Sequence, residues 1–207
     1  PYHDMGLVGC LLTPLLIGYE CNFTAPINFI SQPMMWLQGI SRYRATISGG
    51  PNFAYELCVE KNQPEQIASL DLSCWKVAFN GAEPIRAATM RNFADVFAPA
   101  GFRYASFLPC YGLAEATLMV SAAEVASEPV TLRVNKTALL ARGEAEPSSS
   151  GELELVSSGL IAQPVRIICP QSGERKAAGS IGEIWITGAS VAQGYWAQDA
   201  VLQQQFN

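Results

Sequence analysis

The sequence predicts an α/β fold, with a layered, mostly parallel sheet and helices followed by a small β-rich, barrel-like subdomain. In the first half, short apolar runs that end in Gly, Asn or Pro alternate with helical patterns, which is typical of parallel sheets. After about Val120 the pattern changes to short β-like runs separated by polar turns, as in small β structures. We therefore expect two domains, residues 1–121 and 122–207.

Helices are expected where a capping residue or a proline precedes a helical pattern. Asp4 is an acidic N-cap candidate for the first helix, and Pro26 and Pro33 suit the first position of the next two. The expected helices are 4–17, 26–30, 33–44, 52–60, 84–97 and 136–142. The expected strands are 45–48, 75–79, 104–108 (stopped by Pro109), 128–134, 164–169 and 180–187.

The composition excludes several classes of protein. Charged residues make up 15% of the 207 residues and hydrophobic residues 49%, which excludes global disorder. The 13 basic residues are scattered and the net charge is −5, so we expect no nucleic-acid partner. The longest apolar stretch, 6–19, contains Pro14 and is shorter than the roughly 18 residues of a membrane span. We expect no membrane span and a cytoplasmic protein with reduced cysteines.

Four turns at predicted strand ends are the candidate ligand sites: 49–53, 80–84, 110–115 and 188–190. In α/β sheets, ligands collect at the carboxyl ends of strands, although a glycine-containing turn is weak evidence by itself. Glu115 is either a helix cap or a ligand for a divalent cation, and the residues alone favour the cap. No phosphate loop with Lys-Ser or Lys-Thr, no dinucleotide fingerprint and no Gly-x-Ser-x-Gly motif is present.

Several motifs, in this order, resemble those of the adenylate-forming acyl ligases. They are YHDMGL (2–7), WL (36–37), ISRYRATISGGPNFAYEL (40–57), FNGAEP (79–84), YGLAEAT (111–117), GEIWITG (182–188) and GYW (194–196). Within that superfamily the chain is most similar to the fatty acyl-AMP ligases, which pass acyl groups to carrier proteins. The resemblance covers essentially the whole chain.

The resemblance implies a reaction. A fatty acid carboxylate attacks the α-phosphate of ATP, giving acyl-adenylate and pyrophosphate, and the acyl group then passes to the phosphopantetheine thiol of an acyl carrier protein. Such a site must neutralise the triphosphate and align the carboxylate with phosphorus. ATP is therefore the implied substrate, Mg²⁺ the implied metal, and a fatty acid and an acyl carrier protein the implied partners.

The resemblance also assigns residues to these roles. The implied nucleotide-binding residues are Asn80, Gly81, Ala82, Glu83, Tyr111 and Gly112. Glu115 is implied as the Mg²⁺ ligand, and with Thr117 as a catalytic residue. The implied acyl-binding residues are His3, Met5, Gly50, Asn52 and Phe53.

Two features resemble the AMP-ligase branch rather than coenzyme-A ligases. Ala114 stands where many superfamily members carry threonine, and 130–158 resembles an insertion thought to restrict the swing of a C-terminal domain. An acyl-CoA ligase segment remains the alternative within this class. A non-catalytic binding or scaffold piece remains the alternative outside it.

The resemblance identifies the chain as an internal segment of the large N-terminal domain of such a ligase. The family's phosphate loop, ribose-binding aspartate and catalytic lysine have no counterparts in these residues. We therefore expect the chain alone not to form acyl-adenylate. Pyrophosphate release by the purified chain that depends on both ATP and a fatty acid would contradict this expectation.

Overall fold

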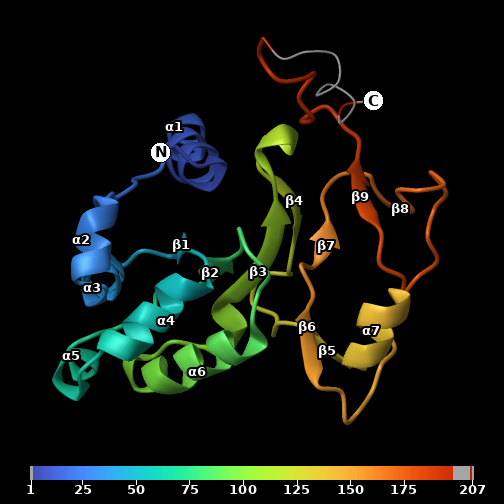
Figure 1. Cartoon of the computed structure of the whole chain (residues 1–207). Helices are drawn as coiled ribbons and strands as arrows, with labels where there is room; N and C mark the ends of the chain where they lie inside the picture. Colours follow the sequence, from blue (N-terminus) through green and yellow to red (C-terminus); the bar gives the residue numbers. More distant parts are fainter. Residues whose placement is uncertain (1, 198–205, 207) are drawn as a thin grey trace.

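The computed structural model describes residues 2–197 and 206 (Figure 1). The α-helices are α1 (Thr13–Ile17), α2 (Pro26–Ser31), α3 (Met34–Tyr43), α4 (Asn52–Lys61), α5 (Pro64–Ala68), α6 (Ala87–Phe97) and α7 (Lys136–Arg142). The π-helix is η1 (Met5–Leu12), and the 3-10 helices are η2 (Ala98–Ala100), η3 (Tyr104–Ser106) and η4 (Ala114–Ala116). The strands are β1 (Ile47–Gly49), β2 (Val77–Asn80), β3 (Phe107–Gly112), β4 (Met119–Ala122), β5 (Thr131–Val134), β6 (Leu153–Val156), β7 (Leu160–Ile161), β8 (Val165–Ile168) and β9 (Glu183–Ile186).

Within the described residues, the main sheet has five strands in the order β1-β2-β3-β4-β7. Strands β1, β2 and β3 are parallel, whereas β4 pairs antiparallel with both β3 and β7. The predicted α/β class, a sheet with helices, is therefore confirmed. The carboxyl ends of β1, β2 and β3 meet at one edge of the sheet, where the candidate turns follow.

The expectation of a barrel-like second part is corrected by the structure. In the part of the chain that the structure describes, β5 pairs with β6 and β8 with β9 as separate two-stranded antiparallel sheets, without a closed barrel. Closure needs an unbroken ladder of hydrogen bonds around the structure, and here each pair ends at its own edges.

The expected domain boundary between residues 121 and 122 stays a prediction. Strand β4 contains both residues, and β7, from the second expected domain, extends the main sheet by pairing with β4. Pro1, 198–205 and Asn207, at the two ends of the expected domains, lie outside the described residues.

An aromatic core joins the sheet to the helices that cover it. Tyr55 of α4, Phe93 of α6 and Phe107 of β3 are fully buried together with Trp75, and their rings contact one another edge-on or stacked. The Tyr55 hydroxyl donates to the Phe79 carbonyl oxygen at 2.7 Å, and burial raises the pKa of Tyr55 well above 10. This core holds α4 and α6 against β2 and β3, and so fixes the turns that follow these strands.

Two predicted boundaries differ from the structure at prolines. The strand expected to stop at Pro109 continues to Gly112, because Pro109 pairs in register with Asn80 and its carbonyl accepts from the Ala123 amide at 2.8 Å. Proline lacks an amide hydrogen but keeps its carbonyl, which here accepts from the residue that directly follows β4. The helix expected from residue 84 begins at Ala87.

The β5–β6 pair lies within the expected insertion, 130–158, and is joined to α6 by an ion pair. Arg91 donates to both carboxylate oxygens of Glu154, at 3.0 and 2.6 Å. This two-point contact with a guanidinium lowers the pKa of Glu154 to about 2. The ion pair therefore connects the insertion to a helix that packs on the main sheet.

No helix in residues 2–197 combines the length and the apolar character that crossing a membrane requires. All six cysteines have free thiols.

Candidate functional site

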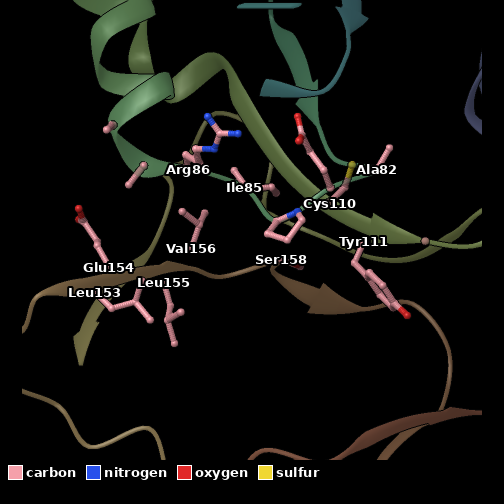
Figure 2. A pocket seen from close by; sticks show the side chains of 15 residues that line it. Ala82, Ile85, Arg86, Cys110, Tyr111, Leu153, Glu154, Leu155, Val156 and Ser158 are labelled. Atoms are coloured by element: carbon pink, nitrogen blue, oxygen red, sulfur yellow. The ribbon is translucent and has the colours of Figure 1, made fainter. Parts of the chain in front are cut away.

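A pocket of about 780 Å³ lies between the chain that follows β2, the end of β3 and strand β6 (Figure 2). Its lining includes four of the six predicted nucleotide-binding residues: Ala82, Glu83, Tyr111 and Gly112. The other lining residues are Pro84, Ile85, Arg86, Ala87, Ala88, Cys110, Leu153, Glu154, Leu155, Val156 and Ser158. The structure therefore brings two of the predicted turns together with β6, which the sequence did not predict as a strand.

The turn that follows β2 packs tightly against β3. A Cβ atom at Gly81 would lie 2.9 Å from the Cys110 carbonyl oxygen, so only glycine fits here without a shift. Ala82 has a φ of 67°, a left-handed conformation that is uncommon for a residue with a side chain. The Cys110 thiol donates to the Asn80 carbonyl oxygen at 3.4 Å. The turn thus has a defined, partly strained shape beside the pocket.

Two buried acceptor atoms in this turn have no hydrogen-bond partner within the described residues. They are Oδ1 of Asn80 and Oε1 of Glu83. Burying an acceptor without a partner costs roughly 1–3 kcal/mol, so native structures contain few such atoms. Both atoms belong to residues that the family resemblance assigns to the nucleotide.

Tyr111 and Gly112 lie at the end of β3. Figure 2 shows the Tyr111 ring at the opposite end of the pocket from Leu153 and Glu154. A Cβ atom at Gly112 would lie 1.9 Å from the Leu118 carbonyl oxygen, where the chain folds back toward β4. Gly112 is therefore required by the close approach of two backbone segments, whether or not it also touches a ligand.

The loop that carries Glu115 and Thr117 is held by the chain that follows β9. The Ala192 amide donates to the Glu115 carbonyl oxygen at 2.7 Å, and the Thr117 hydroxyl donates to the Ser190 carbonyl oxygen at 2.7 Å. The Tyr195 hydroxyl donates to Glu115 Oε1, and this contact with the carboxylate raises the pKa of Tyr195. The sequence analysis did not predict Tyr195 as a site residue, although Tyr195 belongs to the GYW motif that carries part of the resemblance.

The predicted acyl-binding residues form two groups. His3 and Met5 lie at the start of η1, where the Met5 amide donates to Oδ1 of Asp4, the N-cap residue, at 2.7 Å. Gly50 and Phe53 flank the start of α4, 46% of Phe53 being exposed. Among the described residues no hydrogen bond or ring contact joins the two groups, so their common role stays a prediction.

Asn52, the fifth predicted acyl-binding residue, has no exposed surface. Its side chain turns inward to the segment 80–86 and forms hydrogen bonds there. The structure thus places Asn52 beside the predicted nucleotide turn.

Glu115 is the residue that the family resemblance assigns to a magnesium ion. Within residues 2–197 no group of three or more His, Cys, Asp or Glu side chains is placed to hold a metal. Mg²⁺ commonly binds one or two carboxylates and completes its coordination with water and substrate phosphates. A carboxylate offers about four acceptor positions on two oxygens, so Glu115 keeps some beside the one that Tyr195 uses. A single carboxylate at this loop therefore fits Mg²⁺ that is shared with a polyphosphate.

The family model of AMP-binding enzymes matches residues 1–196. The chain belongs to the AMP-binding enzyme family. It is 48% identical over 199 residues to the medium-chain-fatty-acid–acyl-carrier-protein ligase TtuA of Teredinibacter turnerae, covering 94% of this chain and 31% of that protein. The chain therefore spans about a third of the length of this relative.

Solved structures of ligases match the fold of this AMP-binding chain. The fatty acid AMP ligase from Legionella pneumophila has a TM-score of 0.95 at 44% identity, covering 99% of this chain and 36% of that one. A fatty acyl-adenylate ligase of L. pneumophila in complex with acyl adenylate and pyrophosphate has a TM-score of 0.91 at 42% identity, covering 98% and 36%. The resemblance to fatty acyl-AMP ligases that the motifs indicated is confirmed.

Proposed function

We propose that this chain forms the adenine- and acyl-binding segment of a fatty acyl-AMP ligase. The observation that carries the proposal is the pocket beside the turn 80–84, which is lined by Ala82, Glu83, Tyr111 and Gly112. Glu83 borders this pocket, and the 6-amino group of adenine is a donor that suits its carboxylate. The names of relatives, which include fatty-acid AMP and acyl-carrier-protein ligases, support the same assignment.

The proposed reaction has two steps. The fatty acid carboxylate attacks the α-phosphorus of ATP, a carboxylate oxygen–phosphorus bond forms, and pyrophosphate leaves. The phosphopantetheine thiol of an acyl carrier protein then attacks the acyl carbon, and AMP leaves with the electron pair of the carbon–oxygen bond. ATP and carrier proteins with a free phosphopantetheine thiol are cytoplasmic substrates, so the proposal places the protein in the cytoplasm.

The nucleotide end of the site is assigned to the turn and to β3. Ala82 and Glu83 would border the adenine, because both line the pocket. Asn80 and Gly81 would support the turn from behind, because Asn80 is fully buried and Gly81 lets the turn approach β3. Tyr111 would pack its ring on the base, and Gly112 would keep the strand end close to the loop behind it.

The phosphate end is assigned to the loop that carries Glu115 and Thr117. Glu115 would hold Mg²⁺, which neutralises the charge on the phosphates when it is bound. The Thr117 hydroxyl donates to the Ser190 carbonyl oxygen, so Thr117 would serve the site by holding the loop in place. The acyl end is assigned to His3, Met5, Gly50 and Phe53.

Calorimetric titration of the chain with a non-hydrolysable dodecanoyl-adenylate mimic tests the proposal. We expect at least about tenfold tighter binding than for a phenylalanyl-adenylate mimic, because each buried methylene contributes about 0.8 kcal/mol. The two mimics share the adenosine, so the comparison isolates the acyl end. Equal or tighter binding of the phenylalanyl mimic would contradict the fatty-acid assignment, and binding of neither would contradict a site formed by this segment.

A further inference from the structure

The side chain of Asn52 forms three hydrogen bonds, all of them to the segment 80–86. Its Oδ1 accepts from the Arg86 amide at 3.0 Å and from Asn80 Nδ2 at 3.3 Å. Its Nδ2 donates to the Pro84 carbonyl oxygen at 2.9 Å. The Arg86 amide can only donate and the Pro84 carbonyl can only accept, so these two partners determine which end of the Asn52 side-chain amide is oxygen. Asn80 must therefore donate its Nδ2 to the Asn52 oxygen. Its own Oδ1 is left as the acceptor without a partner.

The segment between β2 and α6 depends on these bonds. Residues 81–86 belong to no helix or strand, so side chains have to supply partners for some of their backbone groups. Asn52 holds both ends of the segment and its middle, through Asn80, Arg86 and Pro84. The left-handed conformation of Ala82 is a strained backbone state that persists only where surrounding contacts maintain it.

A direct contact between Asn52 and a ligand is excluded by its burial. The side chain is 0% exposed, and the atoms that cover it belong to this chain. Its neighbours Gly50 and Phe53 lie in the predicted acyl-binding group, whereas its own hydrogen bonds reach only the predicted nucleotide turn. Any effect of Asn52 on binding therefore passes through the turn.

We propose that Asn52 is a positioning residue that sets the shape of the turn 80–86 and thereby the affinity for the adenine nucleotide. This inference rests on the proposed function, because it takes the turn as the adenine site. It replaces the acyl-binding role that the resemblance implied for Asn52. A residue that only stabilises the fold would weaken the binding of nucleotide and fatty acid alike, whereas the proposed role affects the nucleotide selectively.

The test compares Asn52→Leu, which removes all three bonds at similar side-chain volume, with Asn92→Leu. Asn92 is exposed on α6, so this control makes the same chemical change away from the turn. Affinities of the chain for AMP and for dodecanoate are measured by calorimetry, and hydrogen exchange of the Arg86 amide by NMR. We expect Asn52→Leu to weaken AMP binding and to speed exchange at Arg86, each by about tenfold, while dodecanoate binding changes less than about twofold. Asn92→Leu is expected to change neither of the two affinities nor the exchange rate of the Arg86 amide.

Each outcome decides a separate question. Unchanged AMP affinity, or an equal loss for dodecanoate, overturns the positioning role. If Asn52→Leu does not fold, Asn52→Asp decides, because it keeps the acceptor and loses the donor to Pro84: an AMP affinity lower by about threefold supports the proposal, and an unchanged one overturns it. If the unmodified chain binds no AMP, the proposed function fails. Hydrogen exchange of the Arg86 amide still tests whether Asn52 holds the turn 80–86, and equal exchange rates in Asn52→Leu and Asn92→Leu overturn that role.

Discussion

Replacing Glu115 by glutamine is expected to slow fatty-acid-dependent exchange of pyrophosphate into ATP by about 100-fold or more. The substitution keeps the shape of the side chain and the acceptor for Tyr195, but removes the negative charge that a magnesium ion shared with the phosphates requires. The assay uses a chimera in which residues 1–196 replace the matching segment of the L. pneumophila fatty acid AMP ligase, because this chain covers 36% of that protein.

Glu124→Gln in the same chimera is the matched control. Glu124 is exposed after β4 and lies outside the pocket, so its substitution is expected to leave the exchange rate unchanged. The magnesium dependence separates a metal ligand from a structural residue, since Glu115→Gln should also raise the magnesium concentration that gives half-maximal exchange. A rate within about threefold of the parent chimera would show that Glu115 is not the metal ligand.

Replacing Gly112 by alanine is expected to lower the free energy of unfolding of the chain by about 3 kcal/mol or more. The added methyl group would lie 1.9 Å from the Leu118 carbonyl oxygen, which accepts from the Leu113 amide at 2.9 Å. Backbone atoms cannot move aside as a flexible side chain does, so the loop 113–118 has to shift. Because Glu115 and Thr117 lie on this loop, the substitution should also abolish exchange in the chimera. Urea unfolding followed by circular dichroism measures the stability.

Gly39→Ala is the control for this substitution. Gly39 lies within α3, where an added Cβ atom meets nothing within 4 Å. Alanine favours helices, so this variant is expected to gain up to about 1 kcal/mol. If Gly112→Ala unfolds within about 0.5 kcal/mol of the parent chain, the close approach of β3 to the loop does not control the stability of this region.

Much of the local structure was predictable because its causes lie within a few residues. The bounds of α7 (Lys136–Arg142) were predicted, and its cap at Asn135, whose side chain accepts from the Ala138 amide at 3.0 Å, is a local hydrogen bond. Proline at the start of α2 and the acidic cap at Asp4 are of the same kind. Each depends on contacts within one helical turn, which the sequence pattern expresses directly.

Boundaries that depend on a neighbouring strand or helix were predicted incorrectly. Strand β3 continues through Pro109, whose carbonyl accepts from the Ala123 amide. Helix α6 begins only at Ala87, after Pro84 and Arg86 have formed hydrogen bonds with Asn52. The short strands β6 and β7 were not predicted, since their pairing partners lie elsewhere in the chain. The barrel-like expectation failed for the same reason, because local alternation does not specify which strands pair.

The sequence by itself determined the α/β class, the turns at the ends of β1 and β2, and, through its motifs, the resemblance to the fatty acyl-AMP ligases. Only the tertiary structure decided that Asn52 is buried on the turn 80–86, that β6 borders the pocket, and that Tyr195 reaches Glu115 across 80 residues of sequence. The physical reason is the range of the interactions. Caps, prolines and glycines act on the backbone within a few residues, whereas burial and hydrogen bonds between distant segments exist only after the sheet and its aromatic core have brought those segments together.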